Sequence, residues 1–414
     1  MQSRVVINSS LPFTARLKGG HARDIVARDQ ARAQKFLAGL HPHGPVAFHE
    51  ARRRRRHHHG HHGQALSDMS AAAGGTGKSI DVTDAAVEYS TSVGVGTPPT
   101  QYNLLIDTGS SNTWLGAGKK YAPTSSSHST GKSVTVSYGT GSFTGTEYTD
   151  TVTLAPSLVI QNQSIGVASS TQDFSDVDGI LGIGPVDLTE GTVSGNAPVP
   201  TVTDNLYAQG TIATESISIS FSPSTGTDVA NGEMTFGGVD DSKVAGDITY
   251  VPITSTAPAS QYWGIDQDLT YGEGTSLLSG APGIVDTGTT LLLIATDAFQ
   301  AYQKATGATM DQSTGLLSLT ESQFDKLQSL YFNIGGTTFE LTPNAQIWPR
   351  SLNSSIGGQE GKIYLVLSDL GSNSGSGLDF IDGFAFLQRF YSVFDTTNSQ
   401  VGIANTPWTD ATTN

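Results

Sequence analysis

The sequence predicts a mostly β protein built from two related lobes, with a few short helices. The chain has 414 residues, more than one hydrophobic core usually organises. It carries one short phrase twice, LIDTGSS from residue 105 and IVDTGTT from residue 284. It has 48 glycines and only 14% charged residues, a composition typical of short strands joined by polar turns. We therefore expect two units, each with one copy of the phrase.

An uneven charge distribution sets residues 1–70 apart as a leader. They hold 12 Lys/Arg and 4 acidic residues, whereas the rest of the chain holds 10 and 33. Nine of the 10 histidines also lie before residue 70. A leader of charge +8 before a body of charge −23 is typical of a pro-protein whose leader complements what it covers. The expected units are a basic, His-rich prosegment (1–70), an N-terminal β lobe (71–245) and a C-terminal β lobe (246–414).

Hydrophobic periodicity and turn residues predict the individual elements. In chain order they are a helix over 20–40, a loop over 41–64, a Gly/Ala linker over 71–79, a strand over 101–107, a long hairpin bent around glycines over 133–154, a helix over 296–306, and a helix after Thr320, where Gln323 completes a capping box. Cleavage that removes the leader is expected in the exposed stretch 67–79.

Several classes of site are excluded by composition. The chain has no cysteine, which excludes disulfides and thiolate metal sites. No apolar run is long enough to span a membrane, and the first residues, MQSRVVINSSLPF, lack the apolar core of a secretory signal. The stretch AAGGTGKS at 72–79 resembles a phosphate-binding loop, but Ala72 stands where that loop needs glycine, so we interpret it as linker. The basic run at 52–62 lacks the interleaved aromatic residues of a nucleic-acid site.

The repeated Asp-Thr-Gly phrase gives a specific chemical hypothesis. One copy would be an ordinary turn, but duplicated lobes would bring Asp107 and Asp286 side by side. Two carboxylates about 3 Å apart cannot both ionise, so the pair holds one proton. One oxygen can then take a proton from an attacking water while the other gives one to a carbonyl oxygen. A serine mechanism would depend on His128, the one histidine of the body, which lies in a Ser-rich loop without a nucleophile motif.

The order of the motifs resembles that of the pepsin-like aspartic proteases. In chain order they are DTGSSNTW at 107–114, YGTG at 138–141, DGILGIGP at 178–185, DTGTT at 286–290 and FYSVFDTTNSQVGIA at 390–404, and the likeness covers about residues 82–408. The resemblance implies a bilobal β fold with a cleft between the lobes. It also implies a secreted, monomeric endopeptidase that is made as a zymogen and cleaves proteins or peptides at acid pH. The expected partners are substrates and the chain's own prosegment, without metal, cofactor, nucleic acid or membrane.

The same resemblance assigns roles to individual residues. Asp107 and Asp286 are the catalytic dyad, Thr108 and Thr287 cross-link the two loops, and Ser110 and Thr289 bond to the outer carboxylate oxygens. Tyr138 is at the tip of a flap, with its hydroxyl toward Trp114. Gly139 and Thr140 on the flap, and Gly288 with Thr289 on the other side, are expected to present backbone groups to the substrate. Gly109 is expected to support the dyad.

Other interpretations remain beside these. Tyr138 could be an ordinary strand aromatic and Trp114 a core residue. A catalytically silent binding or inhibitor protein would be expected to lose an Asp or the flap Tyr. A glycosidase holds its carboxylates roughly 5 Å or more apart on unlike motifs. Asn162 and Asn353 lie in N-x-S sequons, which carry sugar if the chain is secreted and the sites are exposed.

The chain also departs from its relatives in two places. FIDGFAF at 380–386 replaces the Leu-Gly-Asp phrase of many pepsins, so different packing is expected behind Asp286. The lysine with which the leader of relatives reaches the dyad cannot be located in residues 1–70.

Overall fold

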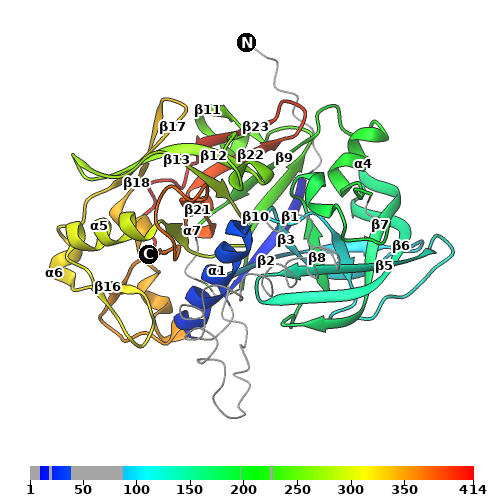
Figure 1. The fold of residues 1–414 in the computed structure, drawn as a ribbon, viewed down its shortest axis with the longest axis horizontal. Helices are drawn as coiled ribbons and strands as arrows, with labels where there is room; N and C mark the ends of the chain where they lie inside the picture. The colour runs from blue at the N-terminus through cyan, green and yellow to red at the C-terminus, as the bar shows by residue number, and fades with distance from the viewer. Residues whose placement is uncertain (1–9, 18–20, 39–86, 196, 224–225, 227) are drawn as a thin grey trace, which may run out of the picture.

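The computed structural model describes residues 10–17, 21–38, 87–195, 197–223, 226 and 228–414. The described chain is mostly β-strand and forms two halves, with one leader helix lying against the space between them (Figure 1). The predicted loop over 41–64 and the linker over 71–79 lie outside the described residues. No helix of the described ranges is long and apolar enough to cross a membrane.

The largest sheet contains 13 strands among the described residues. In order across the sheet they are β11 (Ala245–Pro252), β23 (Gln400–Asn405), β22 (Phe390–Asp395), β9 (Ser216–Phe221), β10 (Asp228–Phe236), β1 (Ser10–Leu17), β2 (Val87–Val95), β3 (Thr100–Asp107), β8 (Gly179–Gly182), β4 (Thr113–Leu115), β7 (Leu158–Gln172), β6 (Gly141–Ala155) and β5 (His128–Tyr138). The sheet continues across the expected lobe boundary at residue 245, because β11 is its edge strand.

Two further sheets form the second half of the molecule. The larger has the strand order β18 (Thr337–Leu341), β17 (Leu330–Ile334), β12 (Gly264–Tyr271), β13 (Thr275–Val285), β21 (Phe380–Asp382), β14 (Leu292–Ile294) and β20 (Leu367–Asp369). The smaller has the order β15 (Thr309–Met310), β16 (Leu317–Leu319) and β19 (Ile363–Tyr364).

Within the described ranges, two helices are long and the others are short. They are α1 (Ala22–Leu37), α4 (Val202–Ala208), α5 (Thr296–Thr306), α6 (Glu321–Phe324) and α7 (Phe384–Leu387), with 3-10 turns η1 (Val186–Thr189), η2 (Asp241–Lys243), η3 (Ala259–Gln261), η4 (Pro343–Gln346), η5 (Arg350–Leu352) and η6 (Ser354–Ile356). The predicted helices over 20–40 and 296–306 are confirmed by α1 and α5. The Thr320 capping box is also confirmed, because its side chain and that of Gln323 bond reciprocally to the backbone. The predicted hairpin over 133–154 corresponds to β5 and β6.

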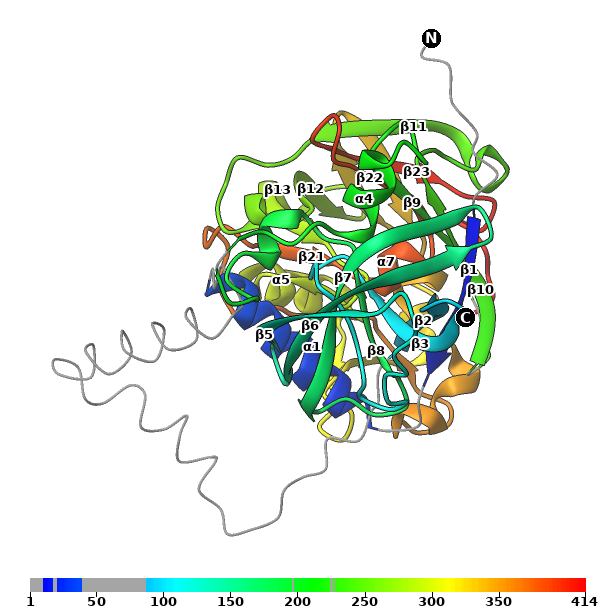
Figure 2. The ribbon, with the colours of Figure 1, turned by 90° about the vertical axis from the view of Figure 1, so that its right-hand side faces the viewer.

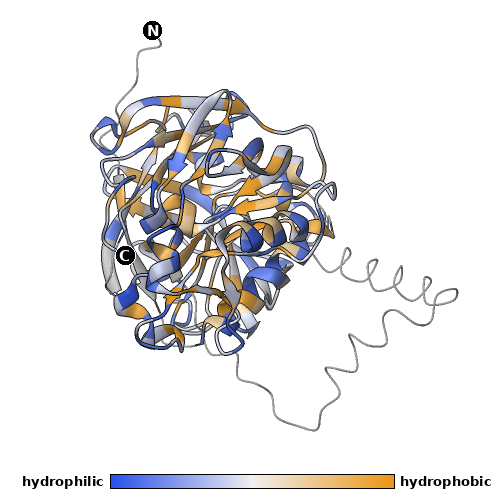
Figure 3. Ribbon diagram, turned by 90° about the vertical axis from the view of Figure 1, so that its left-hand side faces the viewer, coloured by the Kyte–Doolittle hydropathy of each residue, from blue (hydrophilic) through white to orange (hydrophobic). Residues whose placement is uncertain are grey.

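Each lobe places one Asp-Thr-Gly phrase at the end of a buried strand. In the first lobe β3 runs parallel to β8, with Asp107 opposite Gly182. In the second, β13 runs parallel to β21, with Val285 opposite Asp382. Apolar residues run along the interior strands (Figure 3). Both phrases therefore leave rigid, buried strands and turn at the centre of the molecule.

The leader contributes two elements to the fold. β1 lies between β2 and β10 and pairs antiparallel with both, so it is an internal strand of the large sheet. The helix α1 packs beside β5 and β6 (Figure 2) and buries Ile25, Asp29 and Phe36 on one face. Sequence periodicity predicted the helix and not β1, because the pairing of β1 depends on strands far along the chain.

Candidate active site

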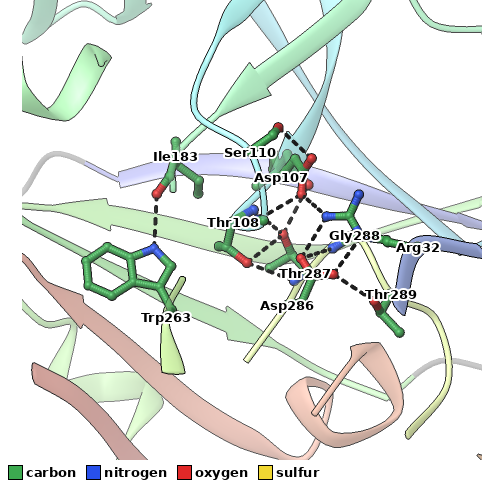
Figure 4. Close-up of polar contacts among 12 residues, drawn as sticks. Arg32, Asp107, Thr108, Ser110, Ile183, Trp263, Asp286, Thr287, Gly288 and Thr289 are labelled. Carbon is green, nitrogen blue, oxygen red and sulfur yellow. Dashed lines mark hydrogen bonds and ion pairs between the residues drawn. The ribbon is translucent and has the colours of Figure 1, made fainter. Parts of the chain in front are cut away.

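The two aspartates are buried together at the ends of β3 and β13. Asp107 is 3% exposed and Asp286 is 0% exposed. Ser110 Oγ donates to Asp107 Oδ2 at 2.6 Å, and Thr289 Oγ1 donates to Asp286 Oδ2 at 2.7 Å. The two carboxylates therefore have equivalent hydrogen-bond partners in the two lobes (Figure 4).

The backbone of each loop also bonds to its own carboxylate. Gly109 N–H donates to Asp107 Oδ1 at 3.0 Å, and Gly288 N–H donates to Asp286 Oδ1 at 3.1 Å. A Cβ added at Gly288 would meet the Arg32 guanidinium and lie 2.8 Å from Asp107 Oδ1. Glycine is thus required where the chain passes close to both carboxylates.

The threonines tie the two loops together. Thr108 N–H donates to Thr287 Oγ1 at 3.0 Å, and Thr287 N–H donates to Thr108 Oγ1 at 2.9 Å. Thr287 Oγ1 also donates to Ile106 O at 3.2 Å. These reciprocal bonds cross the boundary between the lobes and fix the spacing of the aspartates (Figure 4).

An arginine of the leader helix occupies the space between the two carboxylates. Arg32 Nη2 donates to Asp107 Oδ1 at 2.5 Å and to Asp286 Oδ1 at 2.9 Å. Arg32 Nε donates to Asp286 Oδ2 at 2.7 Å. The planar fork of guanidinium donors is suited to bridging two carboxylates in this way. The leader thus reaches the dyad with an arginine and not with a lysine.

The arginine also changes the protonation of the dyad. Burial opposes the charged form of Asp286, but the Arg32 guanidinium, Thr289 and Gly288 outweigh it and hold the pKa of Asp286 below its ordinary value. Burial likewise opposes the charge of Arg32, but Asp107 and Asp286 outweigh it and raise the pKa of Arg32 above its ordinary value. Asp286 and Arg32 are therefore held as an ion pair in the described state.

The β5–β6 hairpin covers the dyad at its tip. Tyr138 ends β5 and is 7% exposed, and Gly139 turns the chain with φ +54°. Trp114 stacks on Phe143, with ring centroids 4.2 Å apart, and its ring centroid lies 6.5 Å from that of Tyr138. Within the described residues, neither Tyr138 Oη nor Trp114 Nε1 has a hydrogen-bond partner of normal geometry. Burial raises the pKa of Tyr138, and an interaction with the Trp114 side chain partly offsets that rise, so the tyrosine hydroxyl faces the indole.

A second leader cation holds the flap. Lys35 Nζ donates to Ser137 O and lies 5.0 Å from the centroid of the Tyr138 ring. Burial, together with the nearby Arg32 charge, lowers the pKa of Lys35 to about 7, although Asp107 and Asp286 partly offset the effect. The leader helix therefore contacts both the dyad and the flap.

Comparisons with known proteins agree with this geometry. Residues 88–406 match the family described as eukaryotic aspartyl protease. The chain belongs to this family. It is 61% identical to polyporopepsin of Irpex lacteus over 338 residues, which cover 81% of this chain and 99% of the relative. It is 31% identical to pepsin A of Sus scrofa over 335 residues, covering 77% and 81% of the two chains. The crystal structure of the aspartic proteinase from Irpex lacteus matches with a TM-score of 0.77 and 62% identity, covering 79% of this chain and 96% of that one.

The predicted fold class, family and activity are confirmed by these matches. The protein is a pepsin-like aspartic endopeptidase with a bilobal β fold. The family match begins at residue 88, so the leader elements lie outside it.

A leader carboxylate also anchors α1 to this aspartyl protease's second lobe. Asp29 is 1% exposed and accepts the backbone N–H of Leu291 at 2.7 Å and of Thr290 at 3.1 Å. Burial raises the pKa of Asp29 to about 7, against the lowering effect of the two N–H groups. The sequence contained one signal for these contacts, because Asp29, Arg32 and Phe36 recur at helical spacing on one face of α1.

The two sequons have different environments. Asn162 is exposed, with φ +53°. Asn353 is 4% exposed, and its Nδ2 donates to Gln359 O at 3.1 Å and to Lys362 O at 2.7 Å. Both amide hydrogens of Asn353 are thus engaged within the fold.

Proposed function

We propose that Asp107 and Asp286 are the acid–base pair of this endopeptidase and that the leader holds them inactive through Arg32. The observation that carries the proposal is the set of three hydrogen bonds from one guanidinium to both carboxylates. Arg32 occupies the space in which a water would have to lie between the carboxylates to attack a peptide bond. The described state then corresponds to a zymogen.

Removal of Arg32 allows the dyad chemistry. Without the cation, two adjacent carboxylates retain one proton between them. The ionised group accepts a proton from a water as that water attacks the peptide carbonyl, and the protonated group donates to the carbonyl oxygen. Ser110 and Thr289 support this assignment, because each orients one carboxylate through a short hydrogen bond.

The substrate would bind as an extended strand beneath the flap. Backbone groups of Gly139 and Thr140 on one side, and of Gly288 and Thr289 on the other, would pair with its main chain. A cavity of about 80 Å³ lies next to the dyad, and Leu105, Phe174, Val177 and Ile180 are among the residues that line it. This lining supports a preference for bulky apolar side chains beside the cleaved bond.

The remaining expectations form part of the same proposal. Residues 1–70 act as the prosegment, 71–245 and 246–414 as the two lobes, and the mature enzyme is a secreted monomer. We infer that Asn162 is the sequon available for a sugar, because the Asn353 amide is buried and doubly bonded. A catalytically silent protein is disfavoured, since both aspartates have the same complete set of partners.

The test is proteolysis by the variants Asp107→Asn and Asp286→Asn after removal of the leader with an added protease. Each should lose several orders of magnitude in kcat/KM on a peptide substrate, because an amide cannot exchange the proton. Asp297→Asn, at the start of α5 in the second lobe, is the matched control and should retain activity. Near-normal hydrolysis by either dyad variant, with contaminating protease excluded, would reject the assignment.

A further inference from the structure

A buried acid–amide pair lies directly behind the second catalytic loop. Asp382 is 0% exposed and Gln267 is 2% exposed. Gln267 Nε2 donates to Asp382 Oδ1 at 3.2 Å. Within the described residues, the two remaining oxygens, Asp382 Oδ2 and Gln267 Oε1, have no hydrogen-bond partner. Both are acceptors if Asp382 is ionised, so the ionised form leaves two buried acceptors unsatisfied.

One proton on Asp382 Oδ2 removes this difficulty. The protonated acid can donate to Gln267 Oε1 while it accepts from Gln267 Nε2, which gives two reciprocal hydrogen bonds. No cation contacts Asp382 among the described residues. Burial raises the pKa of Asp382 to about 8, and the hydrogen bond from Gln267 lowers it only in part.

The pair supports the backbone that carries Asp286. Asp286 N–H donates to Asp382 O at 3.2 Å, and Phe384 N–H donates to Thr289 O at 2.8 Å. A Cβ added at Gly383 would lie 2.6 Å from Thr289 O, so the two segments pack backbone against backbone. Displacement of Asp382 would therefore move the loop that holds the catalytic carboxylate.

The first lobe has apolar residues at the equivalent positions. When the two Asp-Thr-Gly phrases are aligned, Ile106 of the first lobe corresponds to Val285 of the second. Leu181 pairs with Ile106 and Asp382 pairs with Val285, so Leu181 is the equivalent of Asp382. The registers of β2 with β3 and of β12 with β13 relate Gln267 to Val93 in the same way. Val93 and Leu181 are both fully buried. Packing in this fold thus does not require a polar pair here, and only the second lobe has one.

We propose that Asp382 and Gln267 form a proton-dependent positioning pair that keeps the Asp286 loop in its catalytic geometry only while Asp382 is protonated. The inference rests on the proposed role of Asp286. Asp382 does not touch the reacting atoms and acts through the loop.

The sign of the pH effect follows from the direction of the pKa. Asp382 takes up its proton more readily in the folded protein than in the unfolded chain. The stability contributed by Asp382 is fully present below about pH 3.8, its ordinary pKa, and is lost as pH rises through about 8, its pKa in the folded protein. β13, β14 and α7, which pack around Asp382, carry no ionisable side chain. The nearest ionisable groups on β12, the adjoining loop and the leader are Asp266, Asp268, Tyr271, Asp286, Asp29 and Arg32.

Arg32, the one cation among these groups, is paired with Asp107 and Asp286 and does not affect the pKa of Asp382. Asp266 and Asp268 flank Gln267 and alternate to the other face of the strand. The Tyr271 ring packs against that of Tyr302, and Asp286 is paired with Arg32.

The experiment compares melting temperatures of the full chain from pH 4 to pH 9 by circular dichroism. All proteins carry Asp107→Asn to prevent self-cleavage, and the protein with this change alone is the reference. The effects of the leader and dyad are therefore common to all. Asp382→Asn keeps two reciprocal hydrogen bonds and removes the ionisable group. Its melting temperature should match the reference at pH 4 and exceed it by about 5 °C at pH 8.

Two further variants separate titration from simple disruption. Gln267→Glu places two acids together and should lose stability at lower pH than the reference. The double variant Asp382→Asn/Gln267→Glu restores an acid–amide pair with the positions exchanged and should return the reference profile. Asp266→Asn, an exposed change on the same strand, should follow the reference throughout.

If the melting temperatures of Asp382→Asn and the reference change with pH in parallel, the proposal is overturned. If that variant does not fold, a double variant that fails to restore the reference profile would do the same. Loss of the pH effect would leave the dyad assignment intact, because the dyad is tested separately by hydrolysis.

Discussion

Arg32→Met should release the leader from the dyad without a large change in side-chain length. The substitution removes one guanidinium that makes three hydrogen bonds to two buried carboxylates. Loss of one partner from a buried ion pair costs about 3–5 kcal/mol. The Arg32 side chain is 11% exposed, so we take the lower value, which corresponds to about a 100-fold weaker docking of the leader.

The assay is hydrolysis of a fluorogenic peptide after the full chain is diluted to pH 5.5. The wild-type chain should show a lag before activity appears, and Arg32→Met should shorten that lag by about 100-fold. Arg32→Lys keeps the charge but has no planar fork, so it should give an intermediate lag. Arg23→Met, an exposed arginine on the same helix, is the matched control and should leave the lag unchanged.

The pH dependence gives a second readout of the same contact. Because Arg32 holds the pKa of Asp286 below its ordinary value, this contribution to docking is present above about pH 4 and is lost as pH falls further. The difference between Arg32→Met and wild type should therefore shrink toward pH 3. Equal lags for Arg32→Met and Arg23→Met at pH 5.5 would refute the account of Arg32.

Three further predictions concern the leader. Docking of the leader should weaken as pH rises from 6 to 8, because the docked Asp29 has a pKa of about 7 and then loses its proton; Asp29→Asn should abolish this weakening. The rate of tryptic cleavage of the leader, normalised to that of a free reporter peptide, measures docking. Acidification should cut the chain within 67–79, outside the described residues, and N-terminal sequencing should show that Asp286→Asn does not cut itself. Replacement of the five histidines of 57–62, also outside the described residues, should advance activation near pH 5–6 in a salt-sensitive way with little effect at pH 3.5; an unchanged activation profile would reject this role.

The part of the site that repeats along the chain could be predicted from the sequence. Two copies of Asp-Thr-Gly after apolar residues indicated two equivalent loops, and the structure has Asp107 and Asp286 bridged by one guanidinium. Arg32 was not predicted, because it lies in a helix with several arginines and only the docked geometry distinguishes it. Its helical spacing from Asp29 was the available signal.

The Asp382–Gln267 pair shows a different limit. The residues are 115 positions apart, and their contact depends on the register of β12, β13 and β21. FIDGFAF was recognised as a departure that would alter packing behind Asp286, but a sequence does not show that the acid is buried against an amide. The same reasoning applies to β1, whose partners β2 and β10 are distant in sequence.

The most direct test of the central claim is calorimetric titration of the full chain with a peptide analogue whose hydroxyl group mimics the tetrahedral intermediate. At pH 6.5 the wild-type chain should not bind the analogue, because Arg32 occupies both carboxylates. After acid activation it should bind one analogue per chain, and Arg32→Met should bind at pH 6.5 without activation. Equal binding by the wild-type chain before and after activation would contradict an active site held closed by its own leader.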